Sequence, residues 1–137
     1  KQYIQLVKKN ASFLGEVLMS NGIDIVTGGT DSHMVLVDLR SKNVTGKDAE
    51  ESLERAGMTC NKNGVANDPN PPTITSGIRL GSPAATTRGF KEEEFKFIGE
   101  KISTIINALS SSNADISMTE NSILKEVSEL CSKYPIY

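Results

Sequence analysis

The segment 33–39 constrains the fold of this chain most, because it alternates between two faces that are both largely apolar. Successive side chains of a strand point to opposite sides of a sheet. One face would carry His33, Val35, Val37 and Leu39, and the other Met34, Leu36 and Asp38. A strand that is apolar on both faces is typical of the interior of a sheet. The sequence therefore predicts a central strand here.

Amphipathic helices precede and follow this strand. Apolar residues recur at helical spacing over 3–20, after the capping sequence Thr45 to Asp48, over about 91–109 and over about 119–133. Short strands are expected at 23–27, at 58–60 and around 78–80. Helix, two strands, helix, two strands and two helices make an α+β domain, with a small antiparallel or mixed sheet packed by helices mainly on one face.

Composition narrows the class of protein and of partner. The 137 residues fit one domain, and its core must be aliphatic because aromatic residues make up only 5%. A net charge of −2 gives no basis for binding nucleic acid or an anionic membrane surface. No apolar run is long enough to cross a bilayer, and no signal peptide is evident. Cys60 and Cys131 lack metal-ligand spacing, so we expect no metal site and two reduced thiols in a cytoplasmic protein.

The candidate site lies at Ile78-Arg79-Leu80, between Gly77 and Gly81. Alternation places the two aliphatic side chains on one face and the arginine on the other, and the glycines let a backbone or a small ligand come close. A guanidinium held in this way fits the two oxygens of a carboxylate as a fork. From the pattern alone, an ordinary surface arginine on a half-buried strand is the favoured interpretation.

Other polar residues are interpreted as structural from their patterns. His33 is the only histidine, and a lone histidine at the start of a strand is more often hydrogen-bonded structure than a general base. Asp31 fits a turn, and Arg88 fits a pairing with a carboxylate or with helix carbonyls. The segment 64–72 contains three prolines and reads as a stiff surface loop, a place where binding groups are often found.

Four motifs, in their order and spacing, resemble one family. They are Thr30-Asp31-Ser32-His33, Asn61-Lys62-Asn63, the segment 76–84 (Ser-Gly-Ile-Arg-Leu-Gly-Ser-Pro-Ala) and the segment 86–91 (Thr-Thr-Arg-Gly-Phe-Lys). The chain resembles the C-terminal part of serine hydroxymethyltransferase, a pyridoxal-phosphate enzyme, over essentially its whole length. The family interconverts serine and tetrahydrofolate with glycine and 5,10-methylenetetrahydrofolate. The resemblance independently implies the small C-terminal domain of the fold-type I pyridoxal-phosphate enzymes.

The resemblance also implies roles for individual residues. Arg79 matches the arginine that holds the substrate carboxylate, and Asn63 matches an asparagine that contacts the pterin ring of folate. Pro71, Pro72 and Thr73 align with a folate-contacting segment that commonly reads Ser-Pro-Phe, so Pro71 and Thr73 depart from the family wording. Without the resemblance, Asn63 would be interpreted as a turn asparagine.

The resemblance finally implies that part of the enzyme lies elsewhere. The family's cofactor-binding lysine follows a histidine in a threonine-rich motif of the large domain, and no such motif occurs here. We therefore expect residues 1–137, which begin inside a predicted helix, to be a C-terminal small domain that is inactive alone, with no catalytic residue of its own. The parent enzyme would be a homodimer or homotetramer. The alternatives are a stand-alone, non-catalytic small-molecule-binding domain and a protein-interaction module.

Overall fold

The computed structural model describes residues 2–26, 34–58, 60–65, 67–81, 92–111 and 116–133. In chain order the elements are α1 (Gln2–Ser20), β1 (Asp24–Ile25), β2 (Met34–Asp38), the 3-10 helix η1 (Arg40–Lys42), α2 (Gly46–Arg55), β3 (Asn61–Asn63), β4 (Gly77–Gly81), α4 (Glu92–Ser110) and α5 (Ile116–Ser132). Helices and strands follow one another as the sequence predicts, which confirms the α+β class.

The described strands form one antiparallel sheet in the order β1-β2-β4-β3. Strand β2 pairs with β1 on one side and with β4 on the other, so the prediction of a central strand is confirmed. Val35 lies opposite Leu80 and Val37 lies opposite Ile78, and all four side chains are buried. These cross-strand pairs form the floor of the hydrophobic core.

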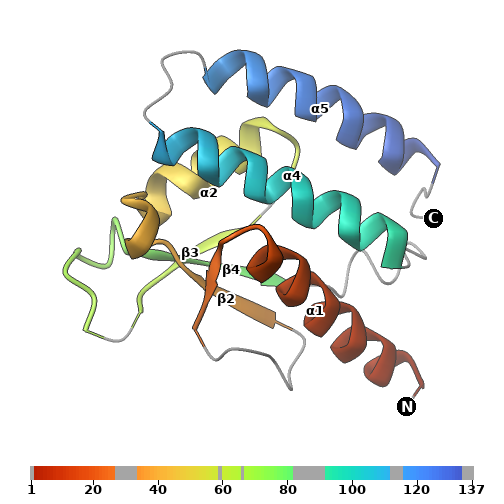
Figure 1. Ribbon diagram of the computed structural model, residues 1–137, viewed down its shortest axis with the longest axis horizontal. Helices are drawn as coiled ribbons and strands as arrows, with labels where there is room; N and C mark the ends of the chain where they lie inside the picture. Colours follow the sequence, from red (N-terminus) through yellow and green to blue (C-terminus); the bar gives the residue numbers. More distant parts are fainter. Residues whose placement is uncertain are drawn as a thin grey trace.

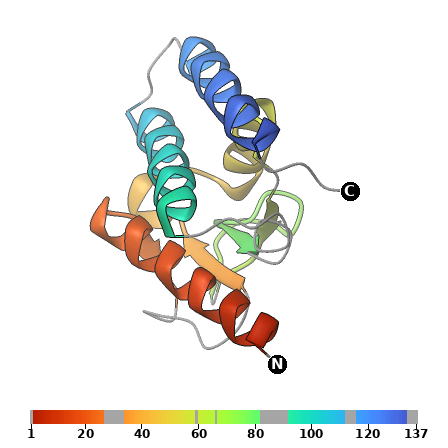
Figure 2. The ribbon, with the colours of Figure 1, turned by 90° about the vertical axis from the view of Figure 1, so that its right-hand side faces the viewer.

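The helices form layers above one face of the sheet. Helices α1 and α2 pack on its strands, α4 packs against both of these helices, and α5 packs on α4 and α2 as the outermost layer (Figures 1 and 2). The buried side chains between the layers are mainly aliphatic, with Phe95 of α4 the largest. The other face of the sheet carries Asp38, Asn61, Asn63 and Arg79, together with Leu36, and we call it the open face.

Two helix ends follow the signals in the sequence. Helix α1 ends at Ser20. Gly22 follows it with a φ of 83°, which is favourable for glycine, and the N–H groups of Gly22 and Ile23 donate to the carbonyls of Met19 and Leu18. At the start of α2, the hydroxyl of Thr45 accepts from the Asp48 N–H at 3.1 Å. This hydrogen bond confirms the predicted cap.

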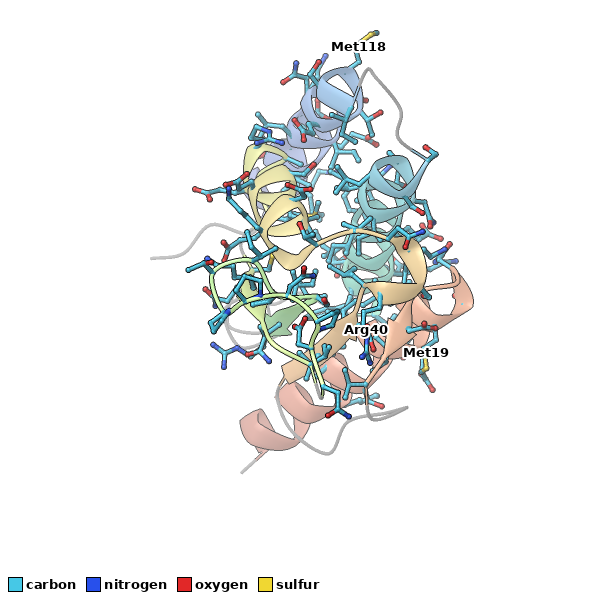
Figure 3. All side chains as sticks on the ribbon, turned by 90° about the vertical axis from the view of Figure 1, so that its left-hand side faces the viewer. Met19, Arg40 and Met118 are labelled. Atoms are coloured by element: carbon cyan, nitrogen blue, oxygen red, sulfur yellow. The ribbon has the colours of Figure 1, made fainter. Side chains whose placement is uncertain are left out.

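Other boundaries differ from the prediction. The expected strand at 58–60 is wrong, because the strand is Asn61–Asn63 and the described residues Met58 and Cys60 lie outside it. The reason is local: the Met58 N–H donates to the Leu53 carbonyl and closes the end of α2. Helix α5 begins at Ile116, three residues before the predicted start at Thr119. Its first turn carries Met118, which points away from the rest of the molecule in Figure 3 and is 68% exposed.

A buried carboxylate joins α5 to α2. Glu120 is 4% exposed, and its two oxygens accept from the Arg55 guanidinium at 2.9 Å each and from the Ser52 hydroxyl. The hydrogen bonds from Arg55, which outweigh the opposing effect of burial, lower the pKa of Glu120, and Ser52 adds to this effect. Because the carboxylate is fully paired, it can be buried between the helices as an anion.

The first turn of α2 also binds the chain that leads into β4. The N–H groups of Gly46 and Lys47 donate to the carbonyls of Thr75 and Ile74, at 3.0 and 2.9 Å. These are two of the N–H groups that a helix start leaves without an intrahelical partner. A Cβ atom on Gly46 would lie well inside van der Waals contact of the Thr75 hydroxyl and the Gly77 carbonyl oxygen. The close approach therefore requires glycine at position 46.

We expect Gly46→Ala to destabilise the chain by about 1–3 kcal/mol, because the added methyl group meets backbone that cannot yield easily. Urea unfolding followed by circular dichroism measures the change. Gly15→Ala is the matched control, since the nearest atoms to a Cβ there are the Val35 methyl groups at 4.0 Å. That variant should be neutral or more stable by up to about 1 kcal/mol. Equal stability of the two variants would contradict the close contact at Gly46.

Candidate functional site

Arg79 lies in the middle of β4 and points to the open face. Its neighbours Ile78 and Leu80 are buried to 0% and 4% exposure, whereas Arg79 is exposed. The predicted alternation is therefore confirmed. In register, Arg79 lies opposite Leu36 of β2 and Asn61 of β3. Directly opposed residues have Cβ atoms about 4.5–5.5 Å apart, so the arginine stands between these two side chains.

Two charged residues of the open face, Asp38 and Arg79, differ in whether they form an ion pair. Asp38 of β2 shares this face and forms a two-pronged ion pair with Arg40, with a shortest contact of 2.7 Å. The hydrogen bond from the Arg40 side chain is the main cause that lowers the pKa of Asp38. None of the four ion pairs found among the described residues involves Arg79. Asp38 therefore already has a partner, whereas Arg79 forms no ion pair with another described residue.

Gly77 serves close packing of the backbone. A Cβ atom at this position would lie 2.7 Å from the Val37 carbonyl oxygen, 2.8 Å from that of Asn63 and 2.8 Å from a Val65 methyl group. Of the two possibilities that the sequence leaves open for this glycine, the structure supports the approach of another backbone. The glycine allows β2, β3 and β4 to converge two residues before Arg79.

The structure brings Asn63 onto the same face as Arg79. Asn63 is the last residue of β3 and lies opposite Gly77, so it is a diagonal neighbour of Arg79. It is thus a strand residue, and its carboxamide nitrogen donates to the Gly64 carbonyl at 2.9 Å. The alternative of a turn asparagine does not describe its position.

Pro71, Pro72 and Thr73 lie in the loop 64–76 that joins β3 to β4. All three are exposed, and the Pro71 carbonyl accepts from the N–H groups of Ile74 and Thr75 at 2.9 Å each. Figure 1 shows this loop projecting beyond the sheet on the left of the view. The loop leaves β3 directly after Asn63 and enters β4 at Gly77, two residues before Arg79, so its two ends adjoin the site.

Asp68 organises this loop, although the sequence analysis did not select it. One carboxylate oxygen accepts from the N–H groups of Val65 and Ser76, at 3.2 and 2.8 Å. The other accepts from the Asn70 N–H at 2.9 Å and from the Ser76 hydroxyl at 2.7 Å. Desolvation alone would raise the pKa of Asp68, but hydrogen bonds from Ser76, Asn70 and Val65 outweigh it and lower the pKa to about 2.

The sequence pattern around Asp68 indicates only one of the hydrogen bonds by which this residue organises the loop. An aspartate that accepts from the N–H two residues ahead is an Asx turn, and Asp68-Pro69-Asn70 is a typical wording for one. The bonds to Ser76 span eight residues, and no local pattern encodes them.

Comparison with known proteins identifies the family to which this site belongs. A family model described as serine hydroxymethyltransferase matches residues 1–102. The chain belongs to the serine hydroxymethyltransferase family. It is 57% and 56% identical over 137 residues to the serine hydroxymethyltransferases of Paramagnetospirillum magneticum and Rhodospirillum centenum. It is 52% identical to serine hydroxymethyltransferase 2 of Burkholderia pseudomallei. Each match covers all of this chain and 32% of the relative, so the chain spans about a third of their length.

Three of the polar residues interpreted from the sequence, Asp31, His33 and Arg88, lie outside the described residues. Among the residues described, no group of three or more His, Cys, Asp or Glu side chains could hold a metal ion. Burial, followed by the nearby charges of Glu50 and Glu54, raises the pKa of the Cys60 thiol to about 12. No helix of the described chain is both long and apolar enough to cross a membrane.

The acid titration of Asp68 tests the loop network. An aspartate in an unfolded chain titrates near pH ~3.9, and its native pKa here is about 2. The carboxylate therefore stabilises the folded loop above the unfolded pKa, and this contribution is lost as the pH falls through the native one. We expect the amide signals of Asn70 and Ser76 in NMR spectra to titrate with a midpoint near 2. Asp68→Asn, as the control, should abolish this titration, and a midpoint near ~4 would contradict the network.

Proposed function

We propose that this chain is the C-terminal small domain of a pyridoxal-phosphate-dependent serine hydroxymethyltransferase. The complete enzyme would interconvert serine and tetrahydrofolate with glycine and 5,10-methylenetetrahydrofolate. The observation that carries the proposal is the state of Arg79, which is exposed on the open face, among described residues that offer it no ion pair. Membership of the family and identities of 52–57% to relatives named serine hydroxymethyltransferase support the assignment.

In this proposal Arg79 binds the carboxylate of serine or glycine as a fork. Two parallel N–H···O bonds fix the plane of the carboxylate as well as its position. Pyridoxal phosphate, when bound, supplies an electron sink for the bond broken at the α-carbon. Which bond breaks depends on the orientation of the amino acid, and a fixed carboxylate removes one rotation about the α-carbon. Strand β4 makes this possible because Ile78 and Leu80, on either side of Arg79, are anchored in the core.

Asn63 and the loop 64–76 would provide part of the tetrahydrofolate site. A carboxamide donates and accepts hydrogen bonds, which suits the donor–acceptor edge of a pterin. Asn63 shares the open face with Arg79, as a site that holds both substrates together would require. Pro71, Pro72 and Thr73 would contribute through exposed backbone and ring surfaces. Pro71 and Thr73 replace the family's serine and phenylalanine, so stacking by the aromatic ring is absent from this segment.

The rest of the enzyme would supply the groups that hold pyridoxal phosphate. The chain spans 32% of the relatives' length, and the histidine–lysine motif for the cofactor is not found in its sequence. The open face, with Arg79 on it, would then complete the site against a large domain. We further propose a cytoplasmic enzyme that is a homodimer or homotetramer, as the resemblance implies.

Replacement of Arg79 tests the proposed carboxylate clamp. In the complete protein, Arg79→Lys keeps the charge but loses the fork, and Arg79→Ala loses both. A hydrogen bond to a charged group contributes about 1.5–3 kcal/mol, so we expect KM for serine to rise at least about tenfold in Arg79→Lys and further in Arg79→Ala. Steady-state kinetics with serine as the varied substrate measure this change.

Lys96→Ala is the matched control, because it removes one positive charge from an exposed position on α4. It should leave KM for serine unchanged. Serine affinity that is the same in Arg79→Ala as in the wild type would show that the clamp is assigned to the wrong residue.

The separation of the two domains leads to a prediction for the isolated chain. Mixed with pyridoxal phosphate, residues 1–137 should give no stoichiometric absorbance band that depends on one lysine, and no transferase activity, because the family's lysine motif is not in the sequence. Titration followed by borohydride reduction and peptide mapping measures the attachment. Labelling of a single lysine at one cofactor per chain would contradict the proposed division between domains.

A further inference from the structure

The loop 64–76 is closed by a single side chain. The Asp68 carboxylate accepts four hydrogen bonds, and their donors come from both ends of the loop, at Val65 and at Ser76, as well as from its middle, at Asn70. A second bond closes the network, since the Asn70 carboxamide donates to the Ser76 hydroxyl at 2.8 Å. One carboxylate therefore connects Val65, two residues after β3, to Ser76, the residue directly before β4.

The backbone beside this carboxylate adopts an unfavourable conformation. Thr75 has φ 58° and Asn67 has φ 56°, in the left-handed region that favours glycine. For a β-branched residue such as Thr75 this conformation costs on the order of 1–3 kcal/mol, so its surroundings must hold it. The Thr75 N–H donates to Pro71, its hydroxyl donates to Gly77 at 3.1 Å, and its carbonyl accepts from Gly46. Asp68 fixes the next residue, Ser76, through both its N–H and its hydroxyl.

The constrained backbone leads directly into the candidate site. The Ser76 carbonyl accepts from the Leu39 N–H at 2.9 Å, which continues the pairing of β2 with β4. Because side chains alternate along a strand, a change of pairing at Ser76 would move Arg79 relative to Asn61 and Leu36. At the other end of the loop, Val65 lies against Gly77, and Asn63 lies opposite Gly77 in the sheet. Both parts of the proposed site thus depend on the same junction.

We propose that Asp68 is a positioning residue that holds Arg79 on β4 and Asn63 on β3 in their working arrangement. This inference rests on the proposed function and goes beyond it, because Asp68 itself would touch neither substrate. It predicts that loss of one side chain weakens the binding of two different substrates together. A residue that served stability alone would change the unfolding temperature and leave the KM values of the folded enzyme as they are.

The test uses Asp68→Asn in the complete enzyme. The carboxamide keeps the size of the side chain but presents one NH₂ group to a set of donors, so at least one of the bonds to Val65, Asn70 or Ser76 must fail. We expect KM for serine and KM for tetrahydrofolate both to rise, by about tenfold, with a smaller change in kcat. Asp48→Asn is the matched control, since it removes the same charge from an exposed position in the first turn of α2 and should leave both KM values unchanged.

A second variant covers the case in which Asp68→Asn does not fold. Ser76→Ala removes only the hydroxyl that donates to Asp68, while the backbone N–H bond at 2.8 Å remains. We expect it to raise both KM values in the same direction by a smaller factor, about threefold. Wild-type KM values for both substrates in every folded variant would overturn the inference. A rise in KM for tetrahydrofolate alone, with KM for serine unchanged, would overturn the claim that Asp68 positions Arg79.

The Arg79→Lys variant distinguishes failure of the carboxylate clamp from failure of the positioning role of Asp68. If Arg79→Lys leaves KM for serine unchanged, the proposed function of Arg79 fails, whatever Asp68 does. If Arg79→Lys raises KM for serine while Asp68→Asn and Ser76→Ala leave both KM values unchanged, the clamp stands and the positioning role of Asp68 fails.

Discussion

The hydrogen bonds between α2 and the two strands β3 and β4 are the constraint on which the rest of the structure depends. The first-turn N–H groups of Gly46 and Lys47 bind the carbonyls before β4, and Glu50, one turn later, accepts from the Lys62 N–H of β3 at 2.9 Å. The Lys62 ammonium adds an ion pair with Glu50 at 3.5 Å. One helix thereby holds both β3 and the chain that leads into β4, and helices α4 and α5 pack on that helix in turn.

The two faces of the sheet differ: one is buried under the helices, and the other carries Asp38, Asn63 and Arg79. Ile78 and Leu80 hold β4 in the core, and burial of each aliphatic side chain contributes about 1.5–3 kcal/mol. On the other face, Asp38 is paired with Arg40, and Arg79 forms no ion pair with another described residue. The loop that carries Asp68 joins β3 to β4. A side chain on a loop or in the middle of a strand is held in a fixed position only when the elements beneath it are rigid. Helix α2 provides this rigidity.

Local patterns in the sequence were sufficient for most of the fold and for the exposure of Arg79 on β4. The two-faced strand at 34–38, the Thr45 cap and the exposed Arg79 between buried aliphatic residues all follow from spacings of two to four residues. The sequence did not indicate contacts between distant residues, such as Asp68 with Ser76 or Glu120 with Arg55. The misplaced strand at 58–60 has a different, local cause. Both Met58 and Cys60 are buried like strand residues, but the hydrogen bond that closes α2 takes the Met58 N–H.

The exposure of Arg79 bears on how a divided site would work. An ion pair that stays exposed to water contributes only about 0–1 kcal/mol, so an amino acid would bind weakly to the open face alone. The same fork becomes stronger once a covering surface excludes water and lowers the effective dielectric constant. In the proposed enzyme, affinity for the carboxylate would therefore depend on closure against the large domain. A strand whose arginine forms no ion pair with another described residue suits this arrangement, because no ion pair within the described part of the chain has to break before the substrate binds.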